Sequence, residues 1–204
     1  VGDGDTAIIV RHLVALSDQD LDRLCELAID CHYRLYLQPK GPETISLHYP
    51  TAGSELMHYE MADHNLKFAF HPSQFIQINP FINQAMVNRA IEQLQLSSDD
   101  RVLDLFCGIG NFSLPIAKHC RYVVGVEGDA SAVAQAVVNA QDNQLDNTEF
   151  FTANLFEPDQ QSWLTQRFDK LVIDPPRAGA KQILPYVSAW QPSIIVYISC
   201  NPAT

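Results

Sequence analysis

The sequence lacks most features of a secreted, membrane-spanning or metal-binding protein. Its five cysteines include no C-x-x-C pair, and an odd count fits reduced thiols better than a disulfide framework. No apolar run approaches the roughly 18 residues that span a bilayer. The first residues, VGDGDTAIIV, lack the basic start of a signal peptide. We therefore expect a cytoplasmic protein with no structural metal and no membrane partner.

Basic residues are also scarce. The chain has 13 Lys and Arg against 24 Asp and Glu, which gives a formal net charge of −11. This balance argues against a broad face that grips nucleic acid, because neutralisation of phosphates by Lys and Arg supplies most non-specific affinity. The 204 residues, 47% of them hydrophobic, suffice for the core of one ordinary domain with a small appendage.

Residues 1–70 carry the signals of a small α+β segment. Apolar residues at helical spacing from Leu21 to Ala28 predict a helix, with Ser17 as its N-cap and Asp20 as the acid of a capping box. Around this helix lie five strand candidates: TAIIVRHLVAL, YRLYLQP, TISLHY, LMHYEMA and LKFAF. No chemical motif is evident in this segment.

Residues 71–204 show a different rhythm, in which strands alternate with helices. The five predicted strands are RVLDLF, YVVGVE, TEFFTAN, KLVIDPP and SIIVYIS. The helices are expected at 80–96, 111–119, 129–145, around Trp163 and at 181–190. Near-continuously apolar strands that alternate with helices are typical of a parallel sheet covered on both faces. We expect an α/β, Rossmann-like domain here.

The stretch VLDLFCGIGNF is the sharpest local signal. An apolar strand reaches Asp104, a Gly108-x-Gly110 turn follows, and a helix opens. Such a turn lets the backbone approach a nucleotide at the carboxyl ends of the strands, where open α/β sheets bind ligands. Glu127 ends the next strand at the sequence distance where dinucleotide-type folds place the acid that binds ribose. The pattern predicts a nucleoside-binding site.

The same turn narrows the choice of cofactor. It does not continue as G-x-G-x-x-G, and an acid precedes it, which would repel a pyrophosphate but suit a cation. S-adenosylmethionine carries an ammonium and a sulfonium, so Asp104 near its amino-acid part and Phe106 against the cofactor are chemically sensible. Alternatively, Asp104 caps the turn and Phe106 packs in the core. The sheet is then expected to be a class I S-adenosylmethionine-dependent methyltransferase domain.

Two further motifs end at the same edge of the predicted sheet. In LVIDPPRAG, the prolines make a rigid loop that holds Asp174 at this edge. In SCNP, Cys200 follows the fifth strand, and Arg177 is the candidate positive charge that would activate its thiol. Cys107 is a rival nucleophile, although its place beside the glycine turn favours packing.

A methyl donor and a thiol at one edge suggest a specific chemistry. Addition of a thiolate to C6 of a pyrimidine makes C5 nucleophilic towards the sulfonium methyl, after which a base removes the C5 proton and the thiol leaves. The target base must leave its stack, which favours loops or single strands of RNA.

Taken together, the motifs resemble those of a known family. FHPSQFIQINPFINQAMV, VLDLFCGIGNFSLPIA, VVGVEGD, DPPRAGA and VYISCNPAT resemble the bacterial 23S ribosomal RNA uracil-C5 methyltransferases of the RlmD (RumA) type, in order over residues 66–204 and more loosely over 5–65. The resemblance implies that residues 1–70 are the α+β connecting segment of that family. It also implies that Cys200 is the nucleophile and that Asp174 lies between the cofactor and the target uracil. It also implies cofactor contacts from Gln77, Phe106, Asn111 and Glu127, and an adenine contact from Asn154.

Some parts of that family have no counterpart in this sequence. Its members carry an RNA-binding barrel and four cysteines that hold an iron–sulfur cluster before this region, and a glutamate that acts as the C5 proton base after it. We therefore expect this chain to be a fragment that is inactive alone. An iron–sulfur cluster is expected only in the full-length protein, and the base is expected beyond Thr204.

Other functions stay open. Transfer-RNA uracil-C5 methyltransferases share the DPPR and SCNP blocks, although FHPSQFIQIN and SCNPAT favour the ribosomal type. A DNA cytosine-C5 methyltransferase, and hence a DNA partner, is disfavoured because Arg177, not a cysteine, follows the proline pair. A non-catalytic S-adenosylmethionine-binding module is the alternative from another class.

Overall fold

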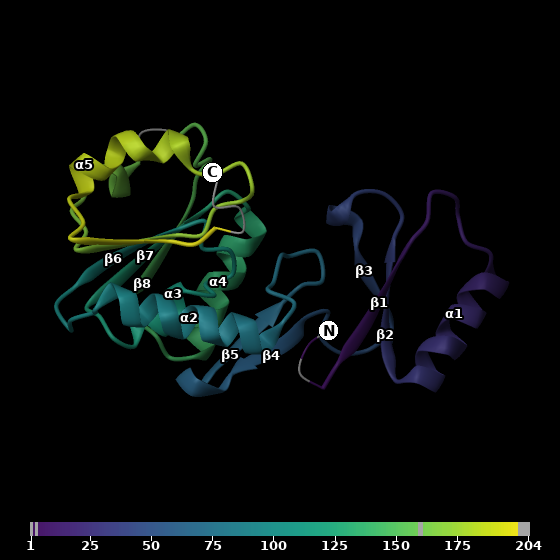
Figure 1. The fold of residues 1–204 in the computed structure, drawn as a ribbon. Helices are drawn as coiled ribbons and strands as arrows, with labels where there is room; N and C mark the ends of the chain where they lie inside the picture. The colour runs from purple at the N-terminus through teal and green to yellow at the C-terminus, as the bar shows by residue number, and fades with distance from the viewer. Residues whose placement is uncertain (1, 3, 159–160, 200–204) are drawn as a thin grey trace. The chain divides into compact units, whose positions relative to one another are not determined.

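The structure is a computed structural model that describes residues 2, 4–158 and 161–199. The chain forms two compact units, one of residues 1–60 and 68–78 and the other of residues 61–67 and 79–204. Each unit is described by itself (Figure 1). The division at residue 70 that the sequence suggests stays a prediction.

The first unit contains a small mixed sheet with one helix. Strand β1 (Thr6–Arg11) pairs in parallel with β2 (Tyr33–Gln38), which pairs antiparallel with β3 (Ser46–Tyr49). Helix α1 (Asp18–Cys31) packs on β2. The predicted capping box is confirmed, because Ser17 Oγ accepts from the Asp20 N–H and the Asp20 carboxylate accepts from the Ser17 N–H, both at 3.2 Å. A short 3-10 turn lies at Pro42–Thr44.

A two-stranded sheet follows, formed by β4 (Met57–Met61) and β5 (Leu66–Phe70) around the 3-10 turn Ala62–His64. All five predicted strand segments of this region therefore contain strands. The first is shorter than its apolar run suggests, since β1 ends at Arg11 and the exposed Leu13 and Val14 lie beyond it.

The second unit is built on a five-stranded parallel sheet. Its strands are β6 (Arg101–Leu105), β7 (Tyr122–Glu127), β8 (Thr148–Thr152), β9 (Lys170–Ile173) and β10 (Ile194–Tyr197). They lie in the order β10-β9-β6-β7-β8, and every pairing is parallel. The predicted α/β fold is confirmed.

Helices cover both faces of this sheet (Figure 1). Helices α2 (Pro80–Leu94), α3 (Ser113–Ala117) and α4 (Ala130–Asp142) lie on one face. The 3-10 segment η4 (Lys181–Tyr186) and α5 (Val187–Trp190) lie on the other, where α5 contacts the 3-10 turn η3 (Ser162–Thr165). Trp163 and Trp190 fill this second layer, each fully buried, with their rings 5.8 Å apart.

Three predicted helices differ from those observed. The one expected around Trp163 is the 3-10 turn η3. The helix expected at 111–119 begins at Ser113, because residues 106–112 form a turn with left-handed positions. The helix expected at 181–190 is a 3-10 segment followed by one short α-helix, with Pro185 inside the former. Proline has no N–H to donate and clashes with the preceding turn, so Pro185, five residues into the segment, disfavours a regular α-helix there.

The strand order places the candidate site. Strand β6 comes first in the chain of this sheet but lies third in space, with β7 on one side and β9 on the other. The chain therefore runs from β6 to β7 and β8 on one side of β6, and then crosses to β9 and β10 on the other side. In open parallel sheets, ligands bind at the carboxyl ends of the strands at such a switch point.

Candidate functional site

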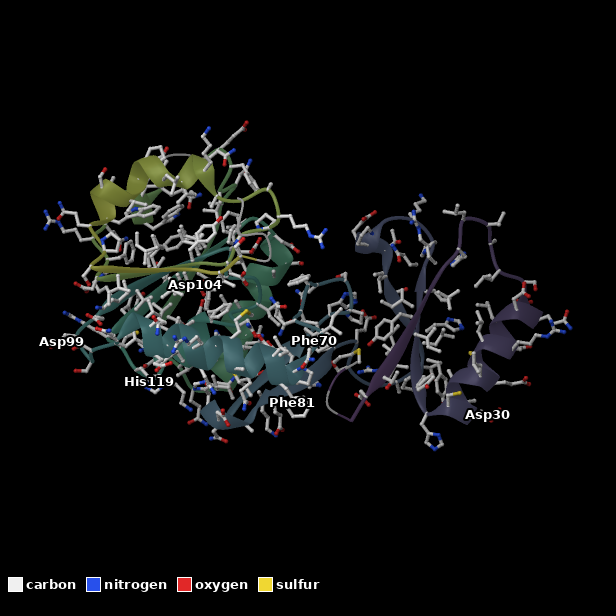
Figure 2. All side chains as sticks on the ribbon, viewed as in Figure 1. Asp30, Phe70, Phe81, Asp99, Asp104 and His119 are labelled. Carbon is white, nitrogen blue, oxygen red and sulfur yellow. The ribbon has the colours of Figure 1, made fainter. Side chains whose placement is uncertain are left out.

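Asp104 is the most unusual residue of the switch point. It lies on the central strand β6 (Figure 2) and has no exposed surface. Ser113 Oγ donates a hydrogen bond to Asp104 Oδ2 at a distance of 2.5 Å, whereas Asp104 Oδ1 has no hydrogen-bond partner among the described residues. Burial raises the pKa of Asp104 to about 7, the hydrogen bond from Ser113 opposes this, and the charges of Asp174 and Glu127 add to it.

Glu127, the last residue of β7, links its own strand end to the glycine-rich turn. Glu127 Oε2 accepts from the Gly108 N–H at 3.1 Å, and Oε1 accepts from the N–H groups of Gly128 at 2.6 Å and Asp129 at 3.1 Å. The structure therefore brings together the two motif residues that the sequence predicted to share a nucleoside site. Three backbone donors hold this carboxylate at the sheet edge.

The turn itself is tightly bent. Phe106, Gly108 and Gly110 have φ values of 65°, 54° and 92°, all in the left-handed region. Phe106, a non-glycine residue there, is held by its N–H, which donates to Val126 O at 2.8 Å. The Phe106 ring lies 5.9 Å from that of Phe156, so two aromatic side chains meet at this edge.

Asp174 follows β9 on the other side of β6. Its N–H donates to Leu105 O at 3.3 Å, which fixes it beside the end of the central strand. Burial raises the pKa of Asp174 to about 6. Beyond it, Pro176 O accepts from the Gly179 N–H at 2.8 Å and Arg177 is exposed, so the predicted rigid turn is present.

The structure describes one of the two candidate nucleophiles, Cys107, but not Cys200. Cys107 is buried at 3% exposure, and burial raises the pKa of its thiol well above the ordinary value, with Asp104 and Glu127 adding to the effect. A neutral, enclosed thiol is a poor nucleophile, so packing is the better interpretation of Cys107. Cys200 lies outside the described residues, and its predicted role stays a prediction.

Three further predicted contacts have distinct surroundings. The side-chain amide of Asn111 pairs with that of Asn83 on α2. Asn154 is exposed, and its Oδ1 accepts from the Phe156 N–H at 3.0 Å, which orders the loop after β8. Gln77 is half-buried in the first unit. The cofactor contacts of these three residues stay predictions.

Ser113 and Asn83 are site residues that the motif analysis missed. Ser113 is fully buried at the start of α3, and Asn83 is 4% exposed on α2. The available signal was a polar residue within an apolar helical stretch, which in a core implies a hydrogen-bonded partner.

The arrangement suits a cationic ligand. The carboxyl groups of Asp104, Glu127 and Asp174 end or follow three adjacent strands, and a buried carboxylate oxygen without a partner is costly unless a ligand donates to it. The positive charges of the ammonium and sulfonium of S-adenosylmethionine fit these carboxyl groups, and the ammonium can also donate a hydrogen bond to an acceptor oxygen. In the described residues, no cluster of three or more His, Cys, Asp or Glu side chains could hold a metal ion.

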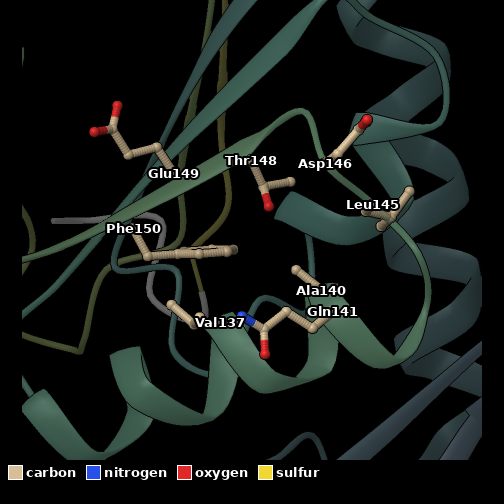
Figure 3. Close-up of a pocket in the computed structure, with 8 residues that line it drawn as sticks. All are labelled: Val137, Ala140, Gln141, Leu145, Asp146, Thr148, Glu149 and Phe150. Atoms are coloured by element: carbon tan, nitrogen blue, oxygen red, sulfur yellow. The ribbon is translucent and has the colours of Figure 1, made fainter.

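A separate groove of about 400 Å³ lies between α4 and the edge strand β8 (Figure 3). Its lining residues are Val137, Ala140, Gln141, Leu145, Asp146, Thr148, Glu149 and Phe150. None of the predicted site residues lines it.

Across the described part of the chain, none of the helices combines the length and apolarity that a membrane crossing requires.

Comparisons with known proteins identify the family to which this chain is similar. The family model for tRNA (Uracil-5-)-methyltransferase matches residues 55–204. The 23S rRNA (uracil(1939)-C(5))-methyltransferase RlmD of Vibrio parahaemolyticus is 47% identical over 205 residues, which cover all of this chain and 45% of that protein. The RlmD of Legionella pneumophila (strain Paris) is 43% identical, over all of this chain and 46% of that protein.

One solved structure extends the comparison to the fold. The Pyrococcus abyssi tRNA (uracil-54, C5)-methyltransferase, in complex with S-adenosyl-L-homocysteine, matches with a TM-score of 0.69 at 24% identity, over 96% of this chain and 46% of that chain. At this identity the match shows the fold alone. This chain spans slightly less than half the length of each of these relatives.

Proposed function

Because the chain belongs to the tRNA (uracil-5-)-methyltransferase family, we propose that it carries the S-adenosylmethionine site of an RNA uracil-C5 methyltransferase. Asp104 would face the charged amino-acid part of the cofactor, Glu127 the ribose hydroxyls, and Asp174 would lie between the cofactor and the target uracil. Phe106, Gly108, Gly110 and Asn111 would line the cofactor, Asn154 would meet its adenine, and Gln77 is a further proposed contact.

One observation carries the cofactor proposal. Asp104 is completely buried at the switch point of the sheet, yet its Oδ1 lacks a hydrogen-bond donor in the described residues. A cationic ligand supplies that donor and lowers the pKa of the acid by direct charge attraction. A pyrophosphate would instead add negative charge beside three carboxyl groups.

The chemistry proposed for the whole enzyme uses a cysteine nucleophile. S-adenosylmethionine, when bound, supplies an electrophilic methyl group and leaves as S-adenosylhomocysteine. The Cys200 thiolate would form a bond to C6 of uracil and make C5 nucleophilic, and Asp174 with Arg177 would hold the uracil ring. After methylation a general base must take the C5 proton. The Cys200–C6 bond then breaks, which restores the thiolate and the C5–C6 double bond.

The proposed substrate is a uracil in 23S ribosomal RNA. Relatives named for that reaction match the whole chain at 41–47% identity. Transfer RNA is the second candidate, since the family model and the solved relative carry that name. We infer a cytoplasmic location for the whole protein, because ribosomal RNA is modified there in bacteria.

The cofactor proposal is tested by calorimetry of S-adenosylhomocysteine with the 204-residue chain. Micromolar binding is expected, and no detectable binding at millimolar ligand would overturn the cofactor site. The nucleophile is tested with RNA that contains 5-fluorouracil, which lacks a removable C5 proton and traps the C6 adduct. A mass shift with the chain, absent for Cys200→Ala, supports catalysis, whereas binding without an adduct in the full-length protein favours a non-catalytic module.

The substrate class is tested with the full-length protein and labelled S-adenosylmethionine. A 23S ribosomal RNA hairpin and a transfer RNA, both undermodified, are offered in competition. Preferential labelling of the ribosomal hairpin is expected. Preferential labelling of the transfer RNA would contradict this expectation and identify transfer RNA as the substrate.

A further inference from the structure

The glycine-rich turn needs support from outside itself. Three of its residues, Phe106, Gly108 and Gly110, have left-handed φ values. Left-handed backbone costs energy at Phe106, which has a side chain, but not at the two glycines. The glycines also leave the turn conformationally free, so contacts with the surrounding residues are needed to favour one conformation.

Helix α2 supports the turn on one side. Asn83 Nδ2 donates to Asn111 Oδ1 at 2.8 Å, and Asn111 Nδ2 donates back to Asn83 Oδ1 at 2.9 Å. Asn83 is 4% exposed, in a helix where a buried amide costs stability unless it is paired. The two residues are 28 positions apart, so this pair ties α2 to the end of the turn.

Helix α4 supports the turn by a second side chain. Asn139 Nδ2 donates to Ile109 O, a carbonyl inside the turn, at 3.2 Å. Gln135, one helical turn earlier, donates through Nε2 to Asn139 Oδ1 at 3.2 Å and so fixes the orientation of that amide. Asn139 is 1% exposed and Gln135 is 8% exposed.

The buried side-chain amides of Asn83 and Asn139 make specific hydrogen bonds to the turn. Helices α2, α3 and α4 share one face of the sheet (Figure 1), where apolar side chains of similar size would pack without any need for partners. The buried amides instead end on Asn111 and on the Ile109 carbonyl. Satisfied buried polar networks fix one conformation, and here the fixed element is the turn between Asp104 and α3.

We propose that Asn83 and Asn139 are positioning residues that hold the glycine-rich turn in the conformation that receives the cofactor. This inference rests on the proposed S-adenosylmethionine site. Neither side chain needs to touch the cofactor. Each acts through the backbone or side chain of a turn residue, and loss of either allows the turn to leave the binding conformation.

The chain offers a matched control for each residue. Asn88 is also on α2, but its side chain pairs with His64 and Asp63, away from the turn. Asn143 caps α4, and its side chain pairs with the backbone of Lys67 and also donates to Asn139 O at 2.7 Å, without reaching the turn itself. Replacing these two residues removes hydrogen bonds of the same kind from the same helices.

The test measures S-adenosylhomocysteine binding by calorimetry for Asn83→Leu, Asn139→Leu, Asn88→Leu and Asn143→Leu, well below the melting temperature of each. Asn83→Leu and Asn139→Leu should weaken binding about 10- to 100-fold, the effect measured when residues that orient metal ligands are lost. The two controls should weaken it less than about 3-fold while lowering the melting temperature by a similar amount.

Hydrogen exchange of residues 106–112 in the unliganded chain gives the second readout. Exchange should be faster in Asn83→Leu and Asn139→Leu and unchanged in the controls. Normal affinity and normal exchange in both, with only a lower melting temperature, would overturn the inference. If the unsubstituted chain does not bind the ligand, the proposed function fails, and the exchange experiment still decides whether the two amides hold the turn.

Discussion

Ser113 Oγ donates to one carboxylate oxygen of Asp104 over 2.5 Å and leaves the other oxygen without a donor in the described residues. The hydrogen bond fixes the rotamer of the acid, and burial makes its charge costly. An acid that is held in this way is more stable neutral than ionised. Ionisation of Asp104 therefore lowers the stability of the unliganded fold.

This relationship predicts that Asp104→Asn stabilises the chain. The pKa of Asp104 is about 7 in the folded state against 3.8 for an ordinary Asp, so the folded state holds a proton that the unfolded state has lost between these values. Wild-type stability therefore falls as the pH rises through this window, whereas the Asn variant has no such loss. The melting temperature of the variant should exceed that of the wild type increasingly from about pH 4 to pH 7, with a constant gap above. An unchanged gap across this range would contradict the buried, raised-pKa acid.

Glu127→Ala should weaken binding of S-adenosylhomocysteine by about 1–3 kcal/mol, the usual loss when a charged hydrogen-bond partner is deleted. The variant loses the proposed ribose acceptor and also the acceptor of the Gly108 N–H. Calorimetry measures the effect, and Glu149→Ala, at an exposed glutamate on β8, is the control. Equal affinities for the two variants would remove Glu127 from the ribose role.

The two turn glycines should differ in their tolerance of alanine. At Gly108 a Cβ would meet nothing within 4 Å, so Gly108→Ala costs only the left-handed backbone penalty of about 1–2 kcal/mol. At Gly110 a Cβ would also lie 2.4 Å from Leu114 Cδ1, and Leu114 is fully buried. Chemical denaturation should show a larger loss for Gly110→Ala. The reverse order would show that the turn relaxes around position 110.

Alkylation should separate the cysteines by environment. Burial raises the pKa of Cys107 well above the ordinary value and that of Cys120 to about 11, so both are neutral at pH 8, and Cys107 is also enclosed. Cys31 is exposed. Among the four cysteines in the described residues, iodoacetamide followed by peptide mass spectrometry should label Cys31 first and Cys107 last. Early labelling of Cys107 in the folded chain would restore it as a candidate nucleophile.

The sequence predicted those parts of the molecule that depend on local pattern. Ser17 and Asp20 marked the start of α1, the apolar runs marked all five parallel strands, and the carboxyl ends of those strands located Asp104 and Asp174. Each of these follows from residues close together in the chain and from the common polarity of parallel strands.

The rest depends on contacts that periodicity does not contain. The pairing of Asn83 with Asn111 joins positions 28 residues apart, and no spacing rule connects them. The helix predicted at 111–119 was too long because the left-handed residues before Ser113 delay its start. Tertiary packing decided both features, and local propensity could not.

The strand order also bears on how the protein is made. The carboxyl groups at the switch point come from β6, β7 and β9, and β9 is the fourth of the five strands in the chain although it lies next to β6 in space. During synthesis, a chain that ends before β9 holds Asp104 with a neighbouring strand on one side only. The proposed cofactor site would therefore be completed late, after Asp174 has left the ribosome, and the cofactor would not stabilise a growing chain until then.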